Sequence, residues 1–252
     1  MKLHQIAVQL YTLRQLCTTH DATAAVLREI KSIGYAAVEI AGLCPLRAEE
    51  IRLLCEDAGL GIVAHNDGAV IREPEKTIEF LAELGVTRAV YPSPSGFNLG
   101  KKRDVERMAE GLTAAGEALR AAGRKLCYHH HSLEFTRLEE TTVLDWLLAA
   151  IPVDLMALEL DTYWVQHGGA SHAEYLRRYA GRIPILHCKD FGNILGTPTF
   201  MEVGRGNLNW KEIIPEADAA GVEWFVVEQD QCPRGPLPSI ATSYETLAAL
   251  AE

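Results

Sequence analysis

Polar residues that could do chemistry stand where short apolar runs of this 252-residue sequence end. In chain order they are Gln9 and Tyr11, Glu39, His65, Tyr91, His129 to His131 with Glu134 just beyond, Asp161, His187 and Glu228. Carboxylates and imidazoles are the side chains that most often move protons in enzymes. They are also ligands for divalent cations. If the fold gathers these run ends in one place, they predict a polar catalytic site.

Four of these residues form an oxygen-rich set with one imidazole: Glu134, Asp161, His187 and Glu228. That mixture suits Mn²⁺, Mg²⁺ or Co²⁺ better than a thiolate-favouring metal, and Zn²⁺ is also compatible with it. Three carboxylates packed together without a cation would repel one another. We therefore expect one divalent metal ion as cofactor, with Mn²⁺ as the first expectation.

Residues two positions apart on a strand face the same side, which extends the predicted site. The pairs that would share a face are His129 and His131, His187 and Lys189, and Glu228 and Asp230. Lys189 is a candidate to neutralise a substrate oxygen or an enolate, although its position also suits a surface lysine. Trp164, three residues after Asp161, would either wall an apolar side of the pocket or pack under a loop.

The elements that must position these residues alternate along the chain. Apolar runs predict strands at residues 6–10, 36–40, 62–64, 88–91, 125–129, 155–160, 183–186 and 224–227. Amphipathic stretches predict helices at 21–33, 46–58, 73–84, 101–122, 138–150, 171–180, 210–220 and 240–251. Such alternation implies parallel strands with right-handed crossovers. Eight units in about 250 residues predict an α/β fold, with residues 1–252 forming a single (β/α)₈ TIM barrel domain rather than an open doubly wound sheet.

The composition limits the partners. A net charge of −10 opposes binding to phosphate backbones, and the basic run at 101–103 suits a solvated helix start, so we expect no nucleic acid. No run approaches the roughly 18 apolar residues of a membrane span. The first residues lack a signal-peptide pattern, and the six cysteines form no C-x-x-C pair, which predicts a cytoplasmic protein with reduced thiols.

Seven ordered segments carry a family resemblance. They are QLYTLR (9–14), VEIAGL (38–43), HHHSLEF (129–135), LDTYW (160–164), LHCKD (186–190), VGRG (203–206) and VEQD (227–230). As a set they resemble the xylose isomerase-like TIM barrels known as sugar phosphate isomerases/epimerases. The resemblance implies metal ligands at Glu134, Asp161, His187 and Glu228. One departure is His130, which replaces the middle residue of the family's usual His-Asn-His.

The leading hypothesis is a metal-dependent isomerase or epimerase acting on a small ketose or keto-sugar. The metal would polarise a carbonyl and an adjacent hydroxyl, and Glu134 or Glu228 would remove the neighbouring proton to give a metal-bound cis-enediolate. Further candidates for proton transfer or charge stabilisation are His65, His129, His131 and Lys189. Candidates for substrate binding are Tyr11, Glu39 and Trp164.

Three alternatives stay open at this stage. A dehydratase or lyase on a keto-inositol or 3-keto-glycoside would use the same enolate but expel a β-substituent, and the histidines after the fifth strand suit it. A nuclease resembling endonuclease IV would need a basic groove, which the acidic composition opposes. A non-enzymatic sugar-binding subunit would not need the strand-end acids. Barrels of this type commonly dimerise, so a homodimer is a further open expectation.

Overall fold

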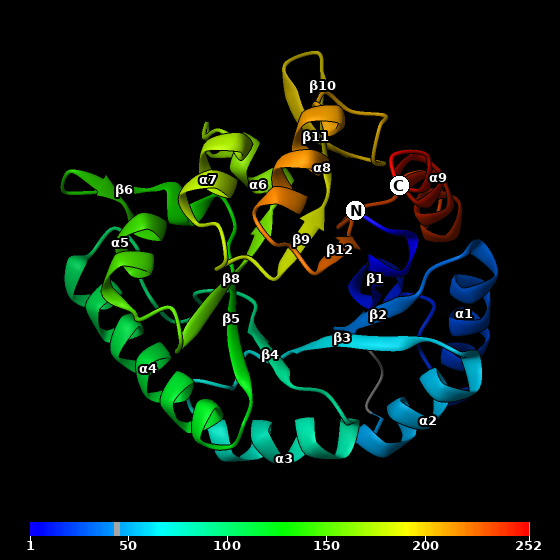
Figure 1. Ribbon diagram of the computed structural model, residues 1–252, viewed down its shortest axis with the longest axis horizontal. Coiled ribbons are helices and arrows are strands. Elements are labelled where there is room, and N and C mark those ends of the chain that lie inside the picture. The colour runs from blue at the N-terminus through cyan, green and yellow to red at the C-terminus, as the bar shows by residue number, and fades with distance from the viewer. Residues whose placement is uncertain (43–45, 252) are drawn as a thin grey trace.

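Eight parallel strands close into a barrel with helices on its outside (Figure 1). The computed structural model describes residues 1–42 and 46–251, so Leu43 and Cys44 lie outside the described residues. Around the barrel the order is β1-β12-β9-β8-β5-β4-β3-β2. The strands are β1 (Ile6–Gln9), β2 (Ala37–Ile40), β3 (Gly61–Asn66), β4 (Arg88–Tyr91), β5 (Lys125–His129), β8 (Met156–Asp161), β9 (Ile185–Cys188) and β12 (Trp224–Val227). The predicted (β/α)₈ barrel is confirmed.

Helices follow the barrel strands and cover their outer faces (Figure 1). They are α1 (His20–Ile33), α2 (Ala48–Ala58), α3 (Pro74–Leu84), α4 (Lys102–Ala121), α5 (Val143–Ala150), α6 (Thr162–His167), α7 (His172–Arg178), α8 (Trp210–Ala219) and α9 (Pro236–Ala249). Their boundaries have local causes. At α1 the Thr19 hydroxyl accepts a hydrogen bond from the Ala22 amide, and Gly34 ends the helix at φ 123°, a conformation that favours glycine.

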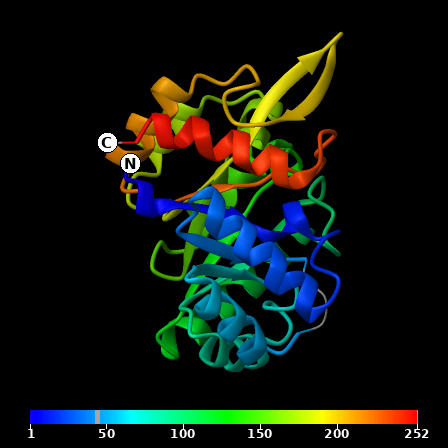
Figure 2. The same ribbon diagram turned by 90° about the vertical axis from the view of Figure 1, so that its right-hand side faces the viewer.

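Two hairpins and one helix depart from the predicted pattern. The helix predicted from residue 138 starts only at Val143, because β6 (Arg137–Leu138) and β7 (Thr141–Thr142) form a hairpin first and Thr142 then caps α5. Helix α6 directly after β8 was not predicted. The second hairpin joins β10 (Asp190–Ile194) to β11 (Thr197–Met201). Figure 2 shows this hairpin projecting from the barrel on the side away from the chain ends.

The barrel interior is filled by small apolar side chains. The interior cluster consists of Ala7, Ala37, Val63, Ala64, Val90, Cys127, Ile185 and Val226. Larger buried side chains such as Leu126, Tyr128 and Phe225 belong to the core between strands and helices. Cys55, Cys127, Cys188 and Cys232 are thiols, as predicted. Within the described ranges, the helices are all too short or too polar to cross a membrane.

Candidate active site and metal centre

A polar layer lies directly above the apolar interior of the barrel. Successive side chains on a strand alternate between its faces, so in a regular strand the residue two positions after an interior residue also points inward. At these positions the chain places Gln9, Glu39, His129, Glu159, His187 and Glu228, all buried. Asp161 follows two positions after Glu159, and Lys189 follows two positions after His187. Both lie at the same end of the barrel and are also buried. The barrel therefore concentrates charged groups where the strands end.

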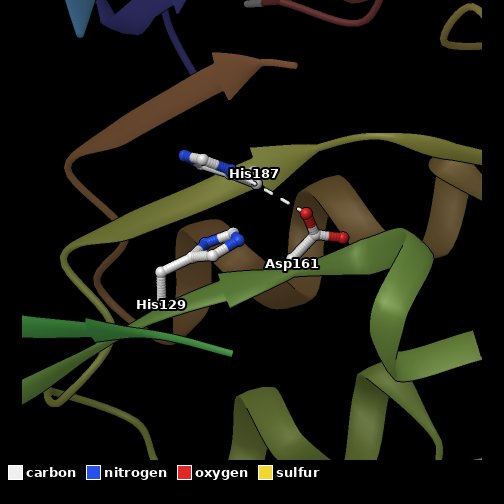
Figure 3. A group of neighbouring side chains, drawn as sticks. All are labelled: His129, Asp161 and His187. Atoms are coloured by element: carbon white, nitrogen blue, oxygen red, sulfur yellow. Dashed lines mark ion pairs between the residues drawn. The ribbon is translucent and has the colours of Figure 1, made fainter. Parts of the chain in front are cut away.

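His129, Asp161 and His187 form the first cluster of this layer. They come from β5, β8 and β9, and Figure 3 shows their side chains converging on one space. Each offers a ligand atom that lies within 4.8 Å of the other two. Asp161 Oδ2 lies 3.8 Å from His187 Nδ1, while Asp161 Oδ1 accepts a hydrogen bond from the Trp164 amide at the start of α6. One carboxylate oxygen thus caps a helix, and the other faces the histidines.

Glu39 and Glu159 form a second cluster with His187. His187 Nε2 lies 3.0 Å from Glu159 Oε1 and 3.1 Å from Glu39 Oε2. Burial opposes a charged imidazole, but the two carboxylates outweigh it and raise the pKa of His187 well above its ordinary value. Burial lowers the pKa of His129 well below its ordinary value, and the neighbouring His187 adds to the effect. Two carboxylates therefore surround His187 Nε2, while its Nδ1 faces Asp161.

Glu159 was not among the predicted site residues. Its side chain is fully buried, and neither oxygen has a hydrogen-bond partner among the described residues. Glu159 Oε1 lies 3.0 Å from His129 Nδ1 as well as from His187 Nε2. The sequence does contain a signal for Glu159, because it is a charged residue within the apolar strand β8, two positions before Asp161.

The Lys189 ammonium lies among three carboxylates. It contacts Glu228 Oε2 and Asp230 Oδ2 directly and lies 3.7 Å from Asp161 Oδ2. Burial disfavours the charged form of this lysine, but Glu228, Asp161 and Asp230 together raise its pKa. Burial raises the pKa of Glu228 to about 7, against the influence of Lys189. The predicted repulsion between packed carboxylates is thus relieved in part by an ammonium group of the chain itself.

A cavity of about 340 Å³ opens above this group. Its wall includes the predicted residues Tyr11, His129, His131, Lys189 and Glu228. Additional lining residues are Gln9, Ala41, Gly42, Asn66, Pro92, Ser93 and Asp230. Glu39, predicted to bind substrate, lies below the cavity and instead accepts hydrogen bonds from Gln9 and Asn66. Trp164 lies in the wall of an adjoining cavity rather than this one.

Glu134 is not brought together with the other predicted metal ligands. Its Oε1 accepts a hydrogen bond from the Tyr128 hydroxyl (2.7 Å), and its Oε2 accepts one from the His131 amide (2.9 Å). Tyr128 belongs to the core between strands and helices, so Glu134 lies outside the barrel interior. The 3₁₀ turn at Leu133–Phe135 produces this placement by turning the chain away from the strand direction.

His65 also lies apart from the predicted site. Its ring stacks on Phe80 of α3, with 4.4 Å between ring centroids. The pairing between β2 and β3 shifts register between Val38 and Ile40, which places Asn66 rather than His65 on the inward face. Asn66 donates a hydrogen bond to Glu39. The shift in register therefore exchanges the predicted histidine for an asparagine at the cavity.

Comparison with known proteins agrees with this geometry. The model of the xylose isomerase-like TIM barrel family matches residues 27–250. The chain belongs to this family. A solved sugar phosphate isomerase/epimerase from Parabacteroides distasonis superposes with a TM-score of 0.81 at 25% identity, over 97% of this chain and 93% of the other. The resemblance seen in the sequence motifs is confirmed.

Two curated relatives are similar over part or most of their length. An inosose dehydratase from Geobacillus kaustophilus is 26% identical over 195 residues, which cover 68% of this chain and 63% of that protein. The rhizopine catabolism protein MocC of Rhizobium meliloti is 25% identical over 264 residues, covering 89% of this chain and 80% of that protein. The chain thus spans less than two thirds of the inosose dehydratase that it matches.

The first cluster has the donor atoms for the divalent cation that membership of the xylose isomerase-like family implies. Asp161 Oδ2 and His187 Nδ1 are buried and lack hydrogen-bond partners in the described part of the chain. Two atoms that each bind one cation at about 2.1 Å lie roughly 3 to 4 Å from each other. The distance of 3.8 Å between Asp161 Oδ2 and His187 Nδ1 fits this range. Two imidazoles and a carboxylate suit Mn²⁺, Co²⁺ or Zn²⁺. The buried cluster could therefore hold a metal ion.

Proposed function

We propose that this chain is an enzyme that removes the proton beside the carbonyl of a small uncharged keto-sugar and then eliminates the substituent on the next carbon, as a dehydratase or lyase. The observation that carries the proposal is the state of Glu228. This carboxylate lines the cavity, with Oε2 held by Lys189 and Oε1 buried without a hydrogen-bond partner among the described residues. The site therefore presents one fixed carboxylate oxygen with spare acceptor capacity.

Glu228 would act first as base and then as acid. Burial raises its pKa to about 7, and a catalytic group is most effective when its pKa lies near the working pH. After it takes the proton beside the carbonyl, the resulting acid can pass that proton to the departing oxygen. Burial lowers the pKa of His131 to about 4, and burial also lowers the pKa of His129 well below its ordinary value. Both imidazoles are neutral at pH 7, so the carboxyl group is the better proton donor.

Lys189 would stabilise the negative charge that develops on the keto oxygen. Its raised pKa keeps the ammonium charged, and its burial removes the screening by water that would weaken the interaction. Thr162 fixes the lysine backbone, because its hydroxyl accepts a hydrogen bond from the Lys189 amide. His129, Asp161 and His187 would hold the divalent cation, for which Mn²⁺ is our first candidate. When bound, that cation supplies Lewis-acid polarisation of the substrate oxygens.

The cavity lining supports an uncharged substrate. Lys189 is the one lysine or arginine among the lining residues of the described chain, and it is already paired with carboxylates. A phosphate group would meet Glu228 and Asp230 there without a second lysine or arginine among the described lining residues. The similarity to an inosose dehydratase supports a neutral polyhydroxy ketone and a reaction that expels a β-substituent.

Isomerisation or epimerisation is the second candidate, supported by the superposition on the sugar phosphate isomerase/epimerase of Parabacteroides distasonis. It shares the first step with elimination but returns a proton to carbon. To separate the two, the Mn²⁺-supplemented protein is incubated in D₂O with 2-keto-myo-inositol and with methyl 3-keto-β-glucopyranoside, and products are followed by NMR. Elimination gives an enone with loss of water or methanol, and isomerisation gives an isomer that has lost no group and carries deuterium at the exchanged carbon. Neither change with any keto-sugar would overturn the proposed function.

A further inference from the structure

A second and larger cavity adjoins the proposed reaction site. Its volume is about 920 Å³, against about 340 Å³ for the cavity over Lys189 and Glu228. The two cavities share Ser93 and His131 in their walls. One side of the larger cavity is the segment between β4 and α4, and the other is the segment after β5 together with Trp164. A substrate bound over Glu228 could therefore extend past His131 into it.

The wall of this second cavity carries large apolar side chains and no acidic, lysine or arginine side chain among the described residues. Phe97, Leu99, Leu133 and Trp164 supply its large side chains, and no aspartate, glutamate, lysine or arginine is among the described residues that line it. The polar side chains of its wall are uncharged hydroxyls and an amide, with His131 as the one imidazole. An anionic or cationic substituent would lose water here without gaining an oppositely charged partner, whereas a flat apolar ring would gain contact area.

The aromatic wall is held in place by its own neighbours. The Trp164 ring packs against Tyr163 (4.8 Å between centroids), Phe200 (5.8 Å) and His131 (5.2 Å). The Arg107 guanidinium lies 5.2 Å from the centre of the Phe97 ring. A wall that is fixed before binding loses little side-chain entropy when a ring packs against it.

Because the two cavities adjoin at Ser93 and His131, we infer that the substrate is a keto-glycoside whose leaving group is an uncharged aromatic alcohol. The ring of this alcohol binds in the second cavity. This inference rests on the proposed function. Glu228 removes the proton on the carbon between the carbonyl and the glycosidic carbon, and the electron pair forms the enolate. The enolate collapses to a carbon–carbon double bond, the glycosidic C–O bond breaks, and the phenolic oxygen leaves and receives the proton. One keto-glycoside thus gives one enone and one phenol, without an oxidant or reductant.

A pair of matched substitutions tests the inference. Leu133 is 59% exposed and lines the second cavity, whereas Leu195 is fully exposed at the tip of the β10–β11 hairpin and lines neither cavity. Leu133→Asp should raise KM for 4-nitrophenyl 3-keto-β-glucopyranoside at least about tenfold, because a carboxylate faces the bound ring. KM for the methyl analogue should change less than about twofold, and Leu195→Asp should affect neither substrate. Equal effects of Leu133→Asp on both substrates, or no effect on either, would overturn the inference.

If the wild type turns over neither keto-glycoside, that outcome counts against the proposed function. The second cavity can then still be tested by a binding measurement. Calorimetry then compares 4-nitrophenyl and methyl β-glucopyranoside as probes of the wild type and of Leu133→Asp. Tighter binding of the aryl probe that is lost in Leu133→Asp would support the aromatic subsite. An aryl probe that binds no more tightly than the methyl probe would overturn it. Phe97→Ala, which alters the opposite wall, should weaken aryl binding in the same way.

Discussion

The ammonium nitrogen of Lys189 lies 3.7 Å from Asp161 Oδ2, a buried oxygen without a hydrogen-bond partner among the described residues that suits a cation. A lysine and a divalent cation would therefore share this carboxylate. Like charges a few ångströms apart repel by about 4 kcal/mol at the effective dielectric of a protein surface. The lysine should accordingly weaken metal binding while it neutralises Glu228 and Asp230.

Removal of this ammonium should strengthen metal binding. We expect Lys189→Met to bind Mn²⁺ at least about tenfold more tightly than the wild type, because one positive charge is lost and three carboxylates keep theirs. Titration calorimetry with MnCl₂ measures the affinity. Lys125→Met, which removes an exposed lysine at the start of β5, should leave it unchanged. Equal or weaker binding by Lys189→Met would show that the lysine and the cation do not compete for Asp161.

Asp190 should be essential for the stability of the segment after the projecting hairpin. Its buried carboxylate accepts hydrogen bonds from the amides of Phe191, Gly204, Gly206 and Leu208 and from the Trp210 indole. In Asp190→Asn an NH₂ group would face some of these donors, so we expect the free energy of unfolding to fall by about 2–3 kcal/mol. Urea unfolding measures the loss, and exposed Asp57→Asn serves as control. A variant as stable as the wild type would contradict this role.

His130 should make the protein less stable in acid. Its Nε2 accepts a hydrogen bond from the Asp161 amide at 3.0 Å, and burial lowers its pKa to about 3. The unfolded chain takes up this proton near pH 6.5, before the folded protein does. The stabilising contribution is therefore complete above about pH 6.5 and is lost progressively as the pH falls towards 3, by at most about 1.4 kcal/mol per pH unit.

The substitution His130→Asn isolates this contribution. Asparagine cannot titrate, and its side-chain oxygen can still accept a hydrogen bond. Urea unfolding at pH 7.5, 5.5 and 4.5 should show a shallower loss of stability in His130→Asn than in the wild type. His20→Asn, which changes an exposed histidine, should leave the wild-type slope unaltered. An identical slope in His130→Asn and the wild type would mean that other groups cause the acid sensitivity.

The barrel and most of its polar end could be predicted because both depend on simple periodicities. Strand runs alternating with glycine-terminated helices determine a parallel closed sheet, and strand-end residues such as Asp161, His187 and Glu228 then share one end of it. Glu159 follows from the same period of two, counted back from Asp161, but its apolar neighbours conceal it.

Other features depend on tertiary details that no local pattern contains. The register shift between β2 and β3 turns His65 outward and Asn66 inward. The 3₁₀ turn after β5 directs Glu134 to Tyr128 instead of the barrel interior. The contact between Lys189 and Glu228 joins residues 39 positions apart and depends on how β9 and β12 pair. These three relationships decide which acidic group remains available to a substrate.

Proton exchange by Glu228 can be measured directly. The protein is incubated in D₂O with 2-keto-myo-inositol or methyl 3-keto-β-glucopyranoside, and NMR follows the proton beside the carbonyl. The wild type should exchange or eliminate that proton, and Glu228→Gln should be slower by about 10²–10⁴-fold, because an amide cannot serve as the base. Glu245→Gln, an exposed change on α9, should match the wild type. Wild-type exchange by Glu228→Gln would contradict the assignment of Glu228 as the base.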